Sequence, residues 1–210
     1  MRLLLTSAGI TNKSLAKALR KLVKGKIRIA FIPTASNFSN HPSKHWLIKN
    51  YNECERLGTV DIVEIAALEK KAWLPRLKAA NVIVVGGGNT RQLIKYVIKS
   101  GLKKELPKLL KSRIYVGISA GSLITAKRLS ASSDYIYNET YRNVPHGLGY
   151  VNFNIRPHLG SNDYPRLNDG YLKKASEKID GNLIALDDNS RILYEDGKMT
   201  IVSEGRWKVY

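Results

Sequence analysis

The sequence predicts an α/β fold built on a single doubly wound, mostly parallel sheet flanked by helices. The first observation is that short runs such as Ile27–Ile32, Asn81–Val85 and Ile114–Ile118 contain consecutive apolar residues rather than an alternation of apolar and polar ones. Continuous apolar runs are typical of parallel strands that are buried on both faces. The second observation is that these runs alternate with amphipathic stretches, and a β-α-β-α order places helices on both sides of the sheet.

The individual elements follow from local patterns in the first 128 residues. Apolar, β-branched runs predict strands over Arg2–Thr6, Ile27–Ile32 (ended by Pro33), Val60–Ile65, Asn81–Val85 and Ile114–Ile118. Helical spacing predicts helices over Lys13–Val23, His45–Leu57 (ended by Gly58), Leu68–Ala80, Arg91–Lys99, Leu102–Lys111 and Ser122–Arg128.

The last third of the chain is less regular. We expect strands over Tyr150–Ile155 and Leu183–Leu186, with a helix over Leu172–Ile179 between them. Short antiparallel edge strands are expected over Arg191–Tyr194, Met199–Val202 and Trp207–Tyr210. Because the sequence has no internal repeat, low-complexity tract or linker, residues 1–210 are predicted to form one domain.

The composition excludes several classes of protein. Hydrophobic residues make up 43% of the 210 positions and charged residues 25%, which excludes intrinsic disorder. A lone cysteine, Cys54, excludes an intramolecular disulfide and a cysteine-based metal cluster. There is no apolar run of the ~20 residues that a membrane helix needs. The apolar start breaks at Thr6-Ser7-Ala8-Gly9, too early for a signal peptide, so a cytoplasmic location is expected.

The net charge of +18 comes from 35 Lys and Arg against 17 Asp and Glu. Such a charge is compatible with binding to nucleic acid or another polyanion. The basic residues are spread, however, over Lys13–Lys26, Lys70–Lys78 and Lys103–Lys111, which are also predicted as amphipathic helices. A lysine-rich solvated surface is therefore the favoured interpretation; nucleic-acid binding is disfavoured, although the charge leaves it open.

The sharpest motif is Gly117-Ile118-Ser119-Ala120-Gly121-Ser122, between an apolar strand and a predicted helix. G-x-S-x-G in that setting is the nucleophile elbow, which projects a serine hydroxyl from a tight turn. A second motif, Gly86-Gly87-Gly88-Asn89, follows the Asn81–Val85 strand and matches neither the dinucleotide fingerprint nor the P-loop. We interpret it as a second source of backbone N–H groups for an oxyanion hole.

A serine nucleophile needs a base and an acid that orients it. Of the four histidines, His41 and His45 lie at the start of a polar helix and His146 lies in a turn. His158 follows a predicted strand and is the preferred base. Asp188, with Asp187 as the fallback, follows the Leu183–Leu186 strand and is the preferred acid. An α/β-hydrolase order would instead require Asp134 or Glu139.

These motifs together resemble the peptidase E family, the α-aspartyl dipeptidases with a class I glutamine-amidotransferase-like fold. The resemblance runs from Leu3-Leu4-Leu5-Thr6-Ser7 through Phe31-Ile32-Pro33-Thr34-Ala35, the glycine-asparagine loop and the serine elbow to Pro157-His158 and the late acidic turn. It implies a triad of Ser119, His158 and Asp188. Some family members carry glutamate where this chain has Asp188. The oxyanion donors would be the amides of Gly88 and Ala120, with Gly87 as the alternative.

The resemblance also implies a reaction, which is the hydrolysis of short peptides, with dipeptides that carry an N-terminal Asp as the expected substrates. Asn89 and Arg166 are expected to contact the substrate, since a guanidinium suits a carboxylate side chain. No metal or organic cofactor is implied, and the protein would be a monomer or a homodimer. Two other interpretations remain open: an inactive amidotransferase-like module that binds a polyanion, and an α/β-hydrolase-type esterase or amidase.

Overall fold

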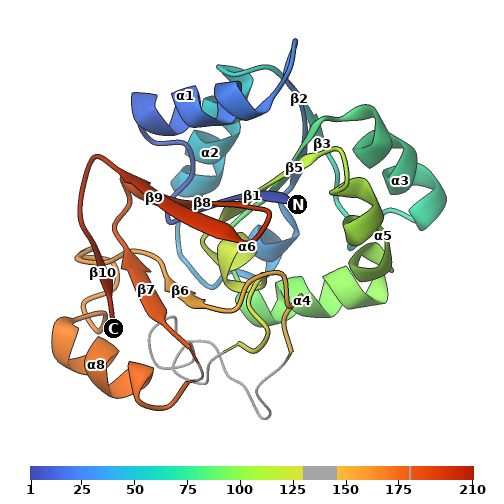
Figure 1. Ribbon diagram of the computed structural model, residues 1–210. Helices are drawn as coiled ribbons and strands as arrows, with labels where there is room; N and C mark the ends of the chain where they lie inside the picture. Colours follow the sequence, from blue (N-terminus) through green and yellow to red (C-terminus); the bar gives the residue numbers. More distant parts are fainter. Residues whose placement is uncertain (130–145, 180) are drawn as a thin grey trace.

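A seven-stranded sheet in the order β3-β2-β4-β5-β1-β8-β9 forms the centre of the computed structural model, which describes residues 1–129, 146–179 and 181–210 (Figure 1). The first five strands in this order run parallel, and β8 and β9 are antiparallel to their neighbours. The strands are β1 Arg2–Thr6, β2 Arg28–Ile32, β3 Thr59–Ile62, β4 Val82–Val85, β5 Ile114–Ile118, β8 Ser190–Glu195 and β9 Lys198–Ser203. The predicted fold class is therefore confirmed.

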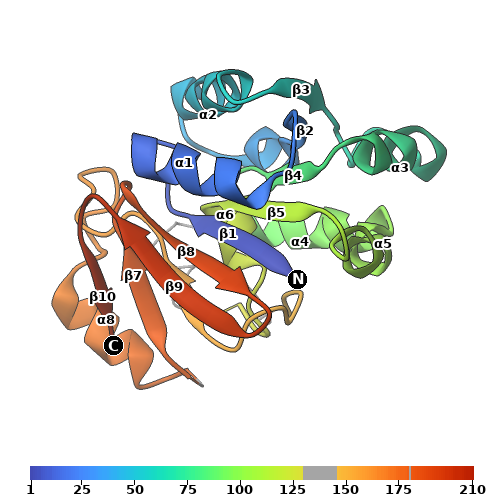
Figure 2. The same ribbon diagram turned by 45° about the horizontal axis from the view of Figure 1, so that its top comes forward.

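Helices cover both faces of this sheet, as Figure 2 shows for α1 on one face and α4 on the other. Leu15 and Leu19 of α1 pack with Leu4 and Val116, while Leu93 of α4 belongs to the core on the opposite face. Burial on both faces explains why successive buried positions of the central strands, such as Leu3–Leu5 of β1 and Ile29–Ile32 of β2, are all apolar. The helices are α1 Lys13–Leu22, α2 His45–Glu55, α3 Lys70–Ala79, α4 Thr90–Lys99, α5 Leu102–Leu109, α6 Ala120–Leu123 and α8 Asp169–Ser176, with a 3-10 helix η1 over Thr34–Phe38.

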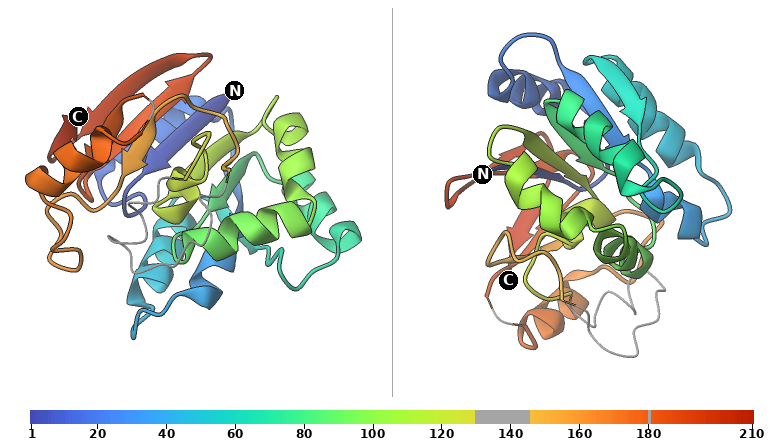
Figure 3. Two further views of the ribbon diagram at one scale, coloured as in Figure 1. Left: turned by 90° about the horizontal axis from the view of Figure 1, so that it is seen from below. Right: turned by 90° about the vertical axis from the view of Figure 1, so that its right-hand side faces the viewer.

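A second, three-stranded sheet in the order β10-β7-β6 lies beside the first, and the left view of Figure 3 shows it with α8 against it. Its strands are β6 Asn154–Arg156, β7 Leu183–Leu186 and β10 Trp207–Val209, with β6 and β7 parallel and β10 antiparallel to β7. Leu172 of α8 packs on Leu183 in a separate small core. The predicted strand at Trp207–Tyr210 thus joins this second sheet, while β8 and β9 form the expected edge of the main sheet.

The strand order brings several turns to one edge of the main sheet. Thr6 at the end of β1 pairs with Ile118 at the end of β5, and Val85 at the end of β4 pairs with Gly117. The carboxyl ends of neighbouring parallel strands form the crevice in which open α/β sheets bind ligands. Among the described residues, no helix combines the length and apolar character required to cross a membrane.

Candidate active site

The nucleophile elbow lies between β5 and α6. Ser119 has φ 47° and ψ −107°, a conformation that L-residues adopt only when their surroundings enforce it. The flanking glycines allow the close approach: a Cβ at Gly121 would lie 2.0 Å from the carbonyl oxygen of Val85, and one at Gly117 would lie 2.7 Å from the amide nitrogen of Ser122. The predicted helix Ser122–Arg128 is shorter than expected and begins directly after Ser119, at Ala120.

His158 lies two residues beyond β6, at the carboxyl end that the sequence indicated. Its Nε2 is 3.0 Å from the Ser119 Oγ. The residue has φ 68°, and its ring stacks on Tyr164 with centroids 4.7 Å apart. The side chain is only 12% exposed, so the ring is held between its neighbours rather than free in solvent.

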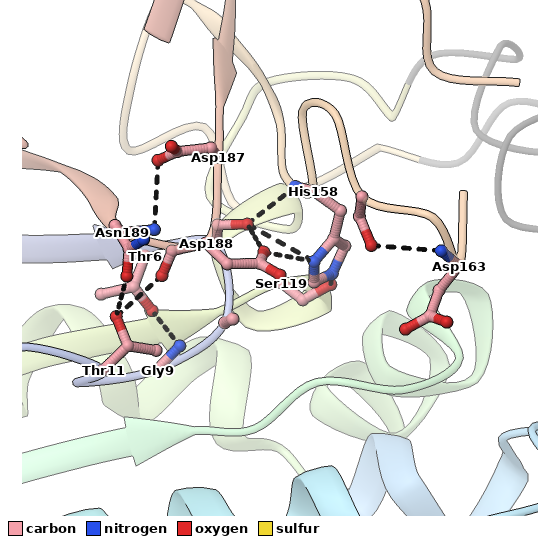
Figure 4. Close-up of polar contacts among 12 residues, drawn as sticks. Thr6, Gly9, Thr11, Ser119, His158, Asp163, Asp187, Asp188 and Asn189 are labelled. Carbon is pink, nitrogen blue, oxygen red and sulfur yellow. Dashed lines mark hydrogen bonds and ion pairs between the residues drawn. The ribbon is translucent and has the colours of Figure 1, made fainter. Parts of the chain in front are cut away.

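Asp188 follows β7 and completes a chain of hydrogen bonds that runs from Ser119 through His158 (Figure 4). Its Oδ1 is 2.8 Å from the His158 Nδ1 and accepts a hydrogen bond from the Ser7 Oγ at 2.7 Å. Burial by itself would raise the pKa of Asp188. The bond and charge of His158, the Ser7 hydroxyl and the charge of Lys49 together outweigh burial and lower the pKa below its ordinary value of 3.8. The carboxyl group is therefore an anion at neutral pH.

The other candidate residues lie elsewhere. The Asp187 carboxylate accepts hydrogen bonds from the Asn189 amide, the Ser190 hydroxyl and the Arg206 amide, so it closes the turn between β7 and β8 instead of facing His158. Figure 4 shows Asp187 directed away from the histidine ring. His41 and His45 are exposed residues at the pocket, and His146 is exposed near Arg128. Asp134 and Glu139 lie outside the described residues.

The glycine loop after β4 lies against the nucleophile. Gly88 has φ 127°, and a Cβ there would lie 2.3 Å from the carbonyl oxygen of Ala35, so only glycine fits. A Cβ at Gly87 would lie 3.3 Å from the Ser119 Cβ. Within residues 1–129, 146–179 and 181–210, the amides of Gly87, Gly88 and Ala120 have no protein acceptor.

A pocket of about 600 Å³ opens over these groups and is also lined by Trp46, Lys49 and Asp163. Asn89 lines it as well, although its side-chain oxygen caps α4 by accepting a bond from the Gln92 amide at 2.9 Å. Arg166 does not line the pocket, and its side chain is exposed. Tyr164, two residues earlier, lines the pocket instead. The expected contact between Arg166 and the substrate stays a prediction.

The pocket residues that sequence reasoning missed include Ser7, Lys49 and Asp163. Lys49 is the one lysine or arginine among the pocket residues that the structure describes. It lies one helical turn after His45 on α2, a spacing that places both on one helix face. Ser7 directly follows β1. A polar residue at the carboxyl end of a central strand is the sequence signal that could have identified it as a site residue.

Comparison with known proteins gives consistent results. The model of peptidase family S51 matches residues 3–202. Peptidase E of Streptomyces coelicolor is 28% identical over 137 residues, which cover 62% of this chain; the match spans little more than half, 56%, of the Streptomyces protein. Peptidase E of a Nostoc species is 27% identical over 181 residues, 83% of this chain and 72% of that protein.

Two solved structures share the fold. A Listeria monocytogenes protein assigned to peptidase E superposes with a TM-score of 0.78 at 20% identity, covering 97% of this chain and 98% of the other. A peptidase from an acI-B1 actinobacterium gives a TM-score of 0.72 at 19% identity, covering 98% and 88% of the two chains. At these identities the likeness establishes the arrangement of strands and helices.

Proposed function

Because the chain belongs to peptidase family S51, a family of serine peptidases, we propose that it hydrolyses short peptides with Ser119 as its nucleophile. The observation that carries this proposal is the unbroken relay of hydrogen bonds at the pocket. The Ser119 Oγ lies 3.0 Å from the His158 Nε2, and the His158 Nδ1 lies 2.8 Å from the Asp188 Oδ1. A nucleophile, a base and an orienting acid within hydrogen-bond reach are the arrangement that activates a serine hydroxyl.

In the proposed mechanism, the Ser119 Oγ attacks the carbonyl carbon of the scissile peptide bond while the His158 Nε2 takes its proton. The same nitrogen then donates that proton to the leaving amine, and the C–N bond breaks to leave an ester on Ser119. Water, deprotonated by His158, hydrolyses the ester and restores the hydroxyl. Asp188 holds the ring and stabilises its charged form during both steps.

The tetrahedral intermediate carries a negative oxygen that needs donors. The amides of Ala120 and Gly88 are proposed to supply them, with the Gly87 amide as the alternative to Gly88. Their lack of protein acceptors within the described chain supports this role, since such groups are free to bind an oxyanion. One such donor contributes about 3–4 kcal/mol to the stability of the transition state in serine proteases.

The proposed substrate is a dipeptide with an N-terminal Asp. A pocket of about 600 Å³ is adequate for a molecule of that size. The Asp163 carboxylate suits the substrate's α-ammonium group, and Lys49 suits the side-chain carboxylate that Arg166 was expected to bind. Asn89 is proposed as a further polar contact through its amide group.

The direct test is Ser119→Ala, compared with the wild type on Asp-Xaa, Leu-Xaa and Arg-Xaa dipeptides and by labelling with a fluorophosphonate. We expect loss of turnover and of labelling, with unchanged thermal unfolding. Full turnover in the variant would remove the mechanism. Equal rates on the three dipeptides would remove the aspartyl preference and leave the peptidase assignment standing.

A further inference from the structure

Ser7 is a buried hydroxyl residue that directly contacts two members of the proposed triad. It is 0% exposed and lies just beyond the carboxyl end of β1. Its Oγ is 2.7 Å from the backbone nitrogen of His158 and 2.7 Å from the Asp188 Oδ1. The His158 Nδ1 is 3.5 Å away, at the limit of a hydrogen bond. Nothing in the mechanism above uses this residue.

The chemistry of these contacts fixes the direction of each hydrogen bond. A backbone N–H can only donate, so the Ser7 Oγ accepts from His158. The single hydroxyl proton is then directed at Asp188, whose lowered pKa makes it an anion and an acceptor. The Asp188 Oδ1 therefore accepts from the Ser7 hydroxyl and from the His158 Nδ1–H together. With the proton on Nδ1, the Nε2 that faces Ser119 is bare, which is the tautomer a general base requires.

The end of β1 also restrains the backbone at both the nucleophile and the base. Of the described non-glycine residues, only Ser119, His158 and Asp196 have positive φ. The Ser119 amide donates to the Thr6 carbonyl at 3.1 Å, and the His158 amide donates to the Ser7 Oγ at 2.7 Å. Strained residues persist where their surroundings hold them. Consecutive residues of one strand end thus hold the two strained residues of the relay.

The same contact joins the two sheets. Ser7 and Ser119 directly follow β1 and β5 of the main sheet, whereas His158 and Asp188 follow β6 and β7 of the second sheet. The segment after β1 is itself braced, because the Asn50 side chain donates to the Ala8 carbonyl at 2.6 Å and the Thr11 hydroxyl donates to the Asp188 carbonyl at 2.7 Å. Ser7 is therefore a rigid point on the main sheet from which the base and acid can be aligned.

We propose that Ser7 is a positioning residue for the reaction: its hydroxyl holds the His158 backbone and the Asp188 carboxylate so that the bare Nε2 faces Ser119. This role rests on the proposed function. It makes Ser7 distinct from a residue that only stabilises the fold, because its loss changes the alignment and tautomer of His158 while the substrate-contacting groups stay in place.

The test compares Ser7→Ala with wild type in steady-state hydrolysis of the best dipeptide. Misalignment of a base costs on the order of 10- to 100-fold in rate, so kcat should fall by about that factor while KM changes little. Ser7→Thr, which keeps the hydroxyl, should recover most of kcat. Ser190→Ala is the matched control, because Ser190 is also a buried serine bonded to a carboxylate, that of Asp187. Its kcat should stay close to wild type even where its stability falls.

A second measurement reads the histidine without turnover. In protein labelled with ¹⁵N-histidine, the ring nitrogen shifts of His158 report which nitrogen carries the proton. Wild type should show the Nδ1–H form, and Ser7→Ala should shift toward a mixture of tautomers, with Ser190→Ala unchanged. If Ser7→Ala keeps both wild-type kcat and wild-type shifts, the positioning role is wrong. If no dipeptide is hydrolysed by wild type, the proposed function fails, and the shifts alone decide the role of Ser7.

Discussion

The charge on Asp188 can be tested by Asp188→Asn, which keeps the size of the side chain and removes its negative charge. When His158 takes the proton from Ser119, it forms an ion pair with a carboxylate whose oxygen is 2.8 Å from Nδ1. Two unit charges about 4 Å apart attract by about 4 kcal/mol at the effective dielectric constant of 20 suited to such sites. The Asp188 side chain is 44% exposed, so solvent screening reduces this to roughly 2–3 kcal/mol.

A loss of that size corresponds to a decrease of about 30- to 150-fold in kcat/KM, since each 1.36 kcal/mol is tenfold. The assay is steady-state hydrolysis of the preferred dipeptide, with thermal unfolding of each variant measured in parallel. Asp187→Asn is the matched control, because it removes the same charge from the adjacent residue. It should lower stability through the turn between β7 and β8 and change kcat/KM by less than about threefold. Wild-type activity in Asp188→Asn, or an equal loss in Asp187→Asn, would refute the assignment of Asp188 as the acid.

Two further predictions concern substrate selection and pH. Lys49→Met should raise KM for Asp-Xaa dipeptides about fivefold and leave kcat little changed, because one exposed ion pair contributes about 1 kcal/mol. Arg166→Met should have no effect on either constant. A rise in KM for Arg166→Met and none for Lys49→Met would assign the carboxylate contact to Arg166. Burial raises the pKa of Glu53 above its ordinary value of 4.5, so the folded state binds the proton more tightly than the unfolded state and the ionised form costs stability at neutral pH. Glu53→Gln should therefore be more stable than wild type to urea at pH 7, with the advantage vanishing as pH falls below 4.5; a less stable variant at pH 7 would contradict this.

Much of the fold is visible in the sequence because burial on both faces leaves a local signature. The predicted strands Arg2–Thr6, Ile114–Ile118 and Leu183–Leu186 have the bounds that the structure gives. The resemblance to the peptidase E family is confirmed by the family model. The second sheet was not predicted, since apolar character identifies a strand without identifying its neighbours. Trp207–Val209 pairs with β7, and no pattern within this segment of the sequence indicates which strand its partner is.

The candidate site also contains residues that the sequence predicts and residues that only the folded chain reveals. Ser119, His158 and Asp188 each follow a predicted strand, and the structure brings them within hydrogen-bond distance of one another. Their catalytic roles stay predictions, and the Ser119 and Asp188 variants above test two of them directly. Arg166 was proposed because the family resemblance implies an arginine downstream of the histidine, and it is not among the residues that line the pocket. Lys49 comes from α2, far from the triad in sequence, and only the folded chain shows that it lines the same pocket.

Ser7 shows why residues that position a catalytic group are harder to find in a sequence than the group itself. A nucleophile elbow requires particular residues in a short motif, so the pattern is local. The contact between Ser7 and Asp188 joins positions 181 residues apart, and it exists because β1 lies between β5 and β8 in the sheet. The requirement on Ser7 is therefore set by strand order and by its contacts with residues that follow the strands of the second sheet. A substitution of Ser7 should leave β1 in place, because the strand is held by its hydrogen-bonded ladders to β5 and β8. Its first effect should be on the alignment of the His158 ring.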